Sequence, residues 1–167
     1  NLVLQTHFHP SGKAEAEATR VAIYRADGPP RHRHRIIQLP PMFSMLEGLE
    51  IPAGEKAHTV RDSFVLPVDV EAFRVGAHAH FLGRRMTLTA TKPDGTRLTL
   101  LDIPRWDFAW QDQYAYRQRH SLPAGTRLDA EVVWDNSADN PQNPSRPPVA
   151  VRWGEQSQEE MGSLLLA

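Results

Sequence analysis

Three His-x-His pairs are the residues of this sequence best suited to chemistry. Six of its eight histidines form these pairs, which are His7 with His9, His32 with His34, and His78 with His80. Side chains two residues apart on a β-strand point to the same face, so one pair can present two imidazoles to one ion. The chain has no cysteine, which excludes disulfides, thiolate zinc sites and iron–sulfur clusters. Any metal must therefore be held by histidine together with methionine or a carboxylate.

The three pairs differ in their surroundings. Residues 31–35 alternate arginine with histidine, and three neighbouring cations repel a divalent ion, which favours a solvated basic loop. Pro10 directly follows the first pair and ends any strand there. His78 and His80 instead close a strand-like run, where their spacing allows both to bind one metal ion. Two exposed or hydrogen-bonded histidines on a sheet face are the alternative interpretation.

Two imidazoles leave a first-row metal short of ligands, and the third donor decides the metal. A carboxylate would favour zinc or iron, whereas a thioether would favour copper, because Cu(I) is soft. A cupin would supply a glutamate three or four residues beyond the pair, but Gly83 and Arg84 stand there. Met161 follows the polar residues 156–160, a poor place for a core side chain, while the other three methionines lie in apolar or strand-like contexts. From residue chemistry alone, packing and metal binding both remain open for Met161.

The elements that must position these residues are short strands. Fourteen prolines and ten glycines interrupt the chain, and no window of 12 residues keeps a helical apolar period. We therefore predict an all-β fold, an antiparallel β-sandwich of jelly-roll type. The expected strands are 2–8, 19–24, 35–39, 59–66, 72–80, 86–91, 96–103, 113–120, 127–134 and 149–153.

The connections between these strands are also informative. Residues 92–96 contain Pro-Asp-Gly between two alternating runs, which predicts a hairpin. Residues 136–148 hold four prolines and almost no apolar side chain, so they form a loop, either ordered or flexible. Residues 157–166 are the only stretch compatible with a short helix. The polar joint 26–35 divides a terminal hairpin, residues 1–30, from the main sandwich domain, residues 31–167.

Composition excludes several function classes. Lysine and arginine number 19 against 20 aspartates and glutamates, a net charge of −1, so no nucleic-acid or membrane partner is expected. No apolar run approaches the roughly 18 residues that span a bilayer. The sequence opens directly on the strand-like residues 2–8, and we expect it to begin inside a longer parent protein.

Several longer stretches carry a family resemblance. Residues 51–56 read Ile-Pro-Ala-Gly-Glu-Lys, residues 72–84 read Ala-Phe-Arg-Val-Gly-Ala-His-Ala-His-Phe-Leu-Gly-Arg, and residues 159–161 read Glu-Glu-Met. They resemble the C-terminal catalytic domain of the copper type II, ascorbate-dependent monooxygenases, the family of peptidylglycine α-hydroxylating and dopamine β-monooxygenases. Bacterial relatives look closer still through residues 106–111 and 135–144. The resemblance runs over residues 2–166.

The resemblance implies a ligand set and an activity. It places His78, His80 and Met161 on a copper ion that binds and activates O2 and faces the substrate. It implies hydroxylation of a C–H bond in a small molecule, with ascorbate as the reductant, in a periplasmic or secreted protein. A copper-binding or copper-delivery module without oxygenase activity is the alternative, and a metal-free structural sandwich is a third reading.

The resemblance also implies a second, incomplete metal site. His7 matches the third ligand of the family's electron-transfer copper, whose other two ligands belong to a preceding copper domain expected in the parent chain. Gly76 stands where the peptide-amidating branch has an arginine that binds the substrate carboxylate, although Arg74 lies two residues away. A peptide substrate is therefore not expected.

Overall fold

A computed structural model describes residues 2–4, 6, 8, 11–30 and 32–167. The chain divides into two compact units, Asn1–Arg33 and His34–Ala167. Among the described residues, no helix is long and apolar enough to cross a bilayer.

The first unit lacks the strand that the sequence led us to expect at residues 19–24. Its described residues are exposed and belong to no helix or strand. Val21, Ile23 and Tyr24 point into solvent, so the segment buries too little apolar surface to hold a hairpin, which is marginal in isolation. His7 lies outside the described residues. The assignment of residues 1–30 to the end of a preceding copper domain stays a prediction.

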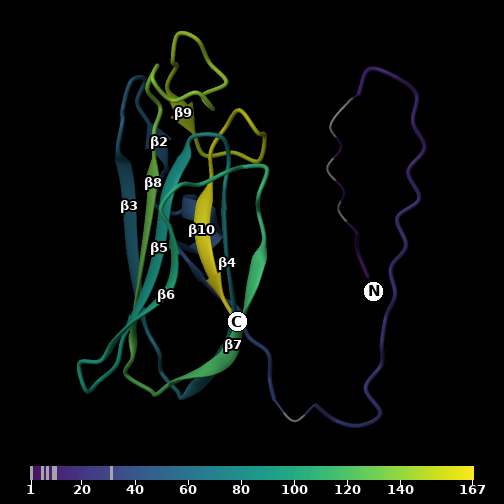
Figure 1. The fold of residues 1–167 in the computed structure, drawn as a ribbon, viewed down its shortest axis with the longest axis vertical. Helices are drawn as coiled ribbons and strands as arrows, with labels where there is room; N and C mark the ends of the chain where they lie inside the picture. The colour runs from purple at the N-terminus through teal and green to yellow at the C-terminus, as the bar shows by residue number, and fades with distance from the viewer. Residues whose placement is uncertain (1, 5, 7, 9–10, 31) are drawn as a thin grey trace. The chain divides into compact units, whose positions relative to one another are not determined.

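The second unit is all-β and antiparallel, as predicted, and it forms a sandwich of two four-stranded sheets (Figure 1). No α-helix occurs in the described part of the chain, and its one helical turn is the 3-10 element η1 (Pro41–Ser44). One sheet has the strand order β1 (Ile37–Leu39), β10 (Gly162–Leu166), β4 (Val70–Ala79) and β7 (Gln113–Leu122). The other has the order β3 (His58–Val65), β8 (Arg127–Trp134), β5 (Gly83–Thr91) and β6 (Arg97–Ile103).

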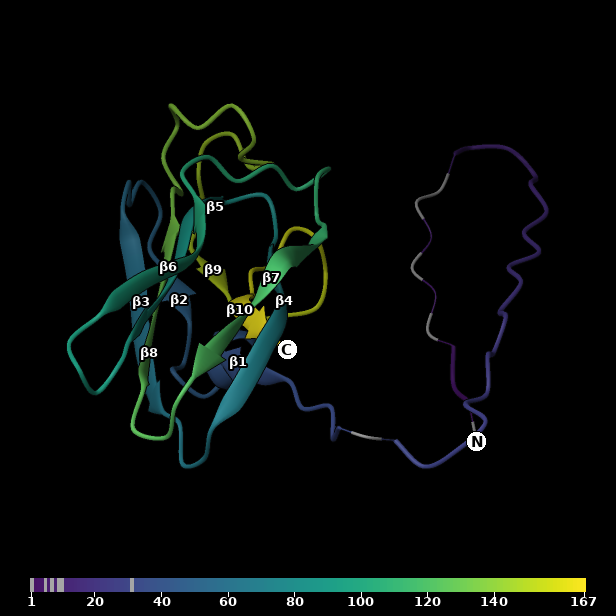
Figure 2. The ribbon, with the colours of Figure 1, turned by 60° about the horizontal axis from the view of Figure 1, so that its bottom comes forward.

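The two sheets form opposite layers (Figure 2). The short pair β2 (Glu50–Ile51) and β9 (Val151–Arg152) lies at one end of the sandwich (Figure 1). Alternate side chains fill the space between the layers. On β8 the buried series is Leu128, Ala130, Val132 and Trp134. Burial of each large apolar side chain contributes about 1.5–3 kcal/mol, so this interior holds the sheets together.

Strand β10 corrects the prediction of a short helix within residues 157–166. It pairs antiparallel with β4, with Gly162 opposite Ala79, and with β1, with Leu164 opposite Leu39. It is thus an interior strand, and its partners are distant in sequence. This pairing outweighs local propensity, because a strand with neighbours on both edges satisfies its backbone hydrogen bonds in full.

The proline-rich loop after β8 is ordered by asparagine side chains. The Nδ2 of Asn136 donates to the carbonyl oxygens of Ile51, Pro52 and Val149 at 3.2, 3.0 and 2.8 Å. Asn143 in turn donates to the Oδ1 of Asn136 at 2.9 Å. Hydrogen bonds of buried asparagine amides hold this loop in place of apolar packing. The loop is therefore ordered rather than flexible.

Candidate metal centre

The paired strands β4 and β10 bring the three predicted copper ligands to one place in the fold. His78 lies near the end of β4 and pairs with Ser163, while His80 follows one residue beyond the strand. Gly162 pairs with Ala79, so the same register places Met161 across from His80. Directly opposed residues of an antiparallel pair share a face. His78, His80 and Met161 therefore lie on the same face of the sheet.

That face is the outer one, away from the sandwich interior. Ala77, Ala79 and Leu164 belong to the apolar core, so the residues that alternate with them point outward. Even so, only 5% of His80 and 8% of Met161 is exposed. The outer face is covered at this point.

Two segments provide the cover. From η1, the ring of Phe43 lies edge-on to His78, with ring centroids 5.4 Å apart. From the connection between β6 and β7, Phe108 lies edge-on to His80 at 5.8 Å. The hydroxyl of Ser44 donates to the carbonyl of Gly162 at 2.8 Å and fastens η1 to β10.

Each imidazole is oriented by a hydrogen bond at Nδ1. The Nδ1 of His78 lies 2.6 Å from the Oε1 of Gln111, and that of His80 lies 3.0 Å from the carbonyl oxygen of Glu159. A carbonyl oxygen only accepts, so each Nδ1 carries the hydrogen and donates it. A metal would bind through Nε2, on the other side of each ring.

The spacing of the two rings suits one shared ion. Their centroids are 5.2 Å apart and their planes are almost perpendicular, at 88°. Two imidazoles bound to one ion at the usual metal–nitrogen distance of about 2.0–2.1 Å have centroids about 5 Å apart. The pair is therefore compatible with two nitrogen ligands to a single metal.

Met161 differs from an ordinary core methionine. It is buried, yet it does not belong to the apolar core that contains Met86. Among the described residues, no group of three or more His, Cys, Asp or Glu side chains is placed to hold a metal. The candidate donors are therefore two imidazoles and, from the strand register, one thioether; imidazole binds copper and a thioether favours Cu(I).

Glu160 is a buried residue at this centre that sequence reasoning missed. Its side chain is 0% exposed, and its carboxylate accepts from the backbone N–H of His80 at 3.0 Å and of Leu82 at 2.6 Å. The indole Nε1 of Trp134 donates to it at 3.0 Å, and the backbone N–H of Met161 donates as well. Burial raises the pKa of Glu160 to about 7, against the opposing effect of these donors. One carboxylate thus joins the end of β4 to the start of β10.

A sequence signal for Glu160 did exist. The acidic side chain directly precedes the run 161–166, four residues of which are Met or Leu, so it was placed to be drawn into the interior, where a carboxylate needs several donors. The glycine in that run is also required. A Cβ at Gly162 would lie 2.5 Å from the ring of Trp134, so only glycine lets the indole approach and reach Glu160.

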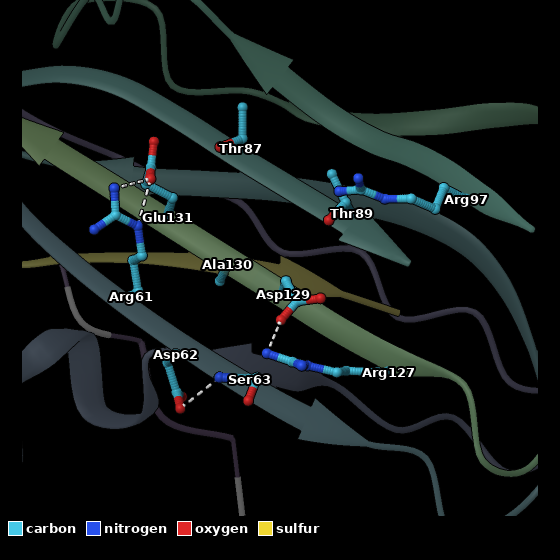
Figure 3. Close-up of a pocket in the computed structure, with 10 residues that line it drawn as sticks. All are labelled: Arg61, Asp62, Ser63, Thr87, Thr89, Arg97, Arg127, Asp129, Ala130 and Glu131. Carbon is cyan, nitrogen blue, oxygen red and sulfur yellow. Dashed lines mark hydrogen bonds and ion pairs between the residues drawn. The ribbon is translucent and has the colours of Figure 1, made fainter. Parts of the chain in front are cut away.

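The other sheet carries a hollow on its own outer face, of about 440 Å³ (Figure 3). Ion pairs cross it, from Arg61 to Glu131 and from Arg127 to Asp129, both at 2.7 Å. Its lining includes three arginines and three carboxylates, so it has no net charge. The lining does not include His78, His80 or Met161, and exposed pairs of this kind are typical of a solvated sheet face.

Comparison with models of known protein families gives no match for this chain, and comparison with curated protein sequences gives none either.

Proposed function

We propose that this chain is the oxygen-activating domain of a copper-dependent monooxygenase, with His78, His80 and Met161 as the copper ligands. The observation that supports the proposal is the register of β4 and β10, which pairs Ser163 with His78 and Gly162 with Ala79. Continued by one residue, this register puts Met161 opposite His80, on the face that also carries His78. The family resemblance of the sequence supports the same ligand set. Copper bound to these ligands would supply the binding and reduction of O2.

The chain's own residues prepare the centre. The side-chain oxygen of Gln111 and the backbone carbonyl oxygen of Glu159 accept hydrogen bonds from Nδ1 of His78 and His80. They keep both imidazoles in the Nδ1–H tautomer, whose Nε2 would bind the metal. The thioether of Met161 favours the reduced ion, which is the state that reacts with O2. The rings of Phe43 and Phe108 pack against the imidazoles and exclude water beside them.

The proposed reaction inserts one oxygen atom of O2 into a C–H bond and reduces the other to water. It consumes two electrons and two protons, and ascorbate is the proposed source of the electrons. The proposed substrate is a small molecule rather than a peptide, because Gly76 has no side chain to bind a carboxylate at the position where the peptide-amidating branch has an arginine. A preceding copper domain in the parent protein, and a periplasmic or extracellular location, belong to the same proposal.

Ascorbate-driven oxygen consumption tests this function. The copper-loaded chain should consume O2 above the background of the same amount of free copper. His78→Ala should abolish the excess, whereas His120→Ala, on β7, should retain it. A chain that binds copper but consumes no O2 above background would be a copper carrier, and equal rates in both variants would contradict the assigned site.

A further inference from the structure

The two histidines of the candidate centre are held by different kinds of group. His80 donates to the main-chain carbonyl of Glu159, two residues before Met161, so its orientation follows from the path of the backbone. His78 donates instead to the side chain of Gln111, in the connection between β6 and β7. Only the second contact depends on the identity of a side chain.

The orientation of the Gln111 amide is itself fixed. Its Nε2 donates to the carbonyl oxygen of Phe108 at 3.0 Å, so Oε1 is the atom that faces His78. An amide oxygen has no hydrogen to give, and the Nδ1 of His78 must therefore be the donor across the 2.6 Å contact. The neutral imidazole then carries its lone pair on Nε2.

The turn that presents Gln111 is also ordered by hydrogen bonds. The backbone N–H of Trp110 donates to the carbonyl of Asp107, and that of Ala109 donates to the Asp107 carboxylate, both at 2.9 Å. The indole of Trp110 donates to the hydroxyl of Tyr114 at 3.0 Å and links the turn to β7. Gln111 is thus exposed to solvent but held in place by its neighbours.

We infer that Gln111 is a positioning residue that fixes His78 in the Nδ1–H tautomer and prepares its Nε2 for a metal. The role of this tautomer in metal binding rests on the proposed copper site. Gln111 is not a ligand in this account and acts only through His78. Outer-shell partners of this kind change metal affinity by about 10–100-fold when removed.

The tautomer can be measured without copper. Long-range ¹H–¹⁵N NMR of the metal-free chain near pH 8.5, well above the ordinary histidine pKa of about 6.5, reports which ring nitrogen carries the hydrogen. His78 should be in the Nδ1–H form in the wild type and should lose that preference in Gln111→Leu. Gln111→Glu retains an acceptor and should retain the tautomer. Gln113→Leu is the matched control, because Gln113 is exposed on the adjoining strand and contacts Arg74 rather than a histidine.

Copper affinity gives the functional readout. In competition with a chromophoric Cu(I) chelator, Gln111→Leu should bind Cu(I) about 10–100-fold more weakly than wild type, and Gln113→Leu should match wild type. An Nε2–H tautomer in the wild type, an unchanged tautomer in Gln111→Leu, or equal affinity in both variants would overturn the inference. A wild-type chain with no Cu(I) binding would overturn the proposed function instead, and the NMR result would still decide what Gln111 does.

Discussion

The outer faces of the two sheets differ in what they do with polar side chains. On the face of β4 and β10, His80, Ser163 and Met161 are buried, and Phe43 of η1 and Phe108 of the connection between β6 and β7 pack against His78 and His80. On the face of β8 and β5, arginines pair with carboxylates in open solvent (Figure 3). On both sheets, these outer faces are formed by the side chains that alternate along each strand with those of the interior. Burial and fixed hydrogen bonds, rather than the number of polar groups, distinguish the candidate centre.

The covered face also contains strained backbone. Met42, Phe43 and Ser44 have φ values of 48°, 54° and 68°, a left-handed run without glycine. Such a conformation costs roughly 1–2 kcal/mol per residue. The Ser44 bond to Gly162 and the contact of Phe43 with His78 help to offset that cost. Strain of this kind is typical of functional sites.

The largest difference in stability between the two faces is expected when a carboxylate on each is replaced by an amide. In Glu160→Gln the amide would offer one acceptor oxygen and turn an NH2 group toward N–H donors, so the free energy of unfolding of the metal-free chain should fall by about 3 kcal/mol. Glu131→Gln, which weakens the exposed pair with Arg61, should cost less than about 1 kcal/mol. Urea unfolding measures both, and equal losses would remove the distinction between the faces.

Close packing against β10 provides the next test. In Gly162→Ala the new Cβ would meet the Trp134 ring at 2.5 Å, and we expect a loss of about 1–3 kcal/mol. Gly76→Ala on the neighbouring strand is the matched control, because its nearest contact is the exposed Gln113 side chain, which is free to shift. Thermal unfolding should rank Gly162→Ala well below Gly76→Ala, and the reverse order would contradict the packing described for Trp134.

Two variants of one residue separate strain from hydrogen bonding in η1. Ser44→Ala loses the bond to Gly162 and keeps the positive φ, and it should cost about 1–2 kcal/mol. Ser44→Gly loses the same bond but relieves the strain, so its cost should be smaller by roughly 1 kcal/mol. Chemical denaturation gives both values, and a glycine variant less stable than the alanine variant would argue against backbone strain here.

The smallest expected effect concerns an exposed ion pair. The Nζ of Lys56, 2.6 Å from Asp139, lowers the pKa of that carboxyl, so the pair adds stability above the ordinary pKa and loses it as pH falls. In Lys56→Met, NMR titration should show the pKa of Asp139 returning toward 3.8. The pKa of Asp94, lowered mainly by the backbone N–H of Thr96, should not change. A shift at Asp94 instead would contradict this assignment of causes.

Much of the sandwich was predictable because most of its strands are marked by alternating side chains and by turn residues close to them in the sequence. The Pro-Asp-Gly turn between β5 and β6 forms as predicted, with Gly95 at φ 84°. The run 72–80 corresponds to β4 (Val70–Ala79), which contains His78 and ends one residue before His80. Alternation and turn chemistry act over a few residues, and a single sequence displays them.

The remainder depended on partners far along the chain. Strand β10 is defined by β4, more than eighty residues earlier, and its run of three leucines carries no alternation to mark it. The burial of Glu160 follows from the same long-range pairing, and the contact of Gln111 with His78 joins residues 33 positions apart in the sequence. Met161 was selected by residue type and resemblance, but its position opposite His80 required the register.

X-ray absorption of the Cu(I)-loaded chain tests whether His78, His80 and Met161 are the copper ligands. We expect one copper per chain with two imidazole ligands and one sulfur ligand. The sulfur signal should disappear in Met161→Leu and persist in Met86→Leu, whose methionine lies in the apolar core. Failure to bind stoichiometric copper, or a copper site that is the same in both variants, would contradict the assignment of His78, His80 and Met161 as its ligands.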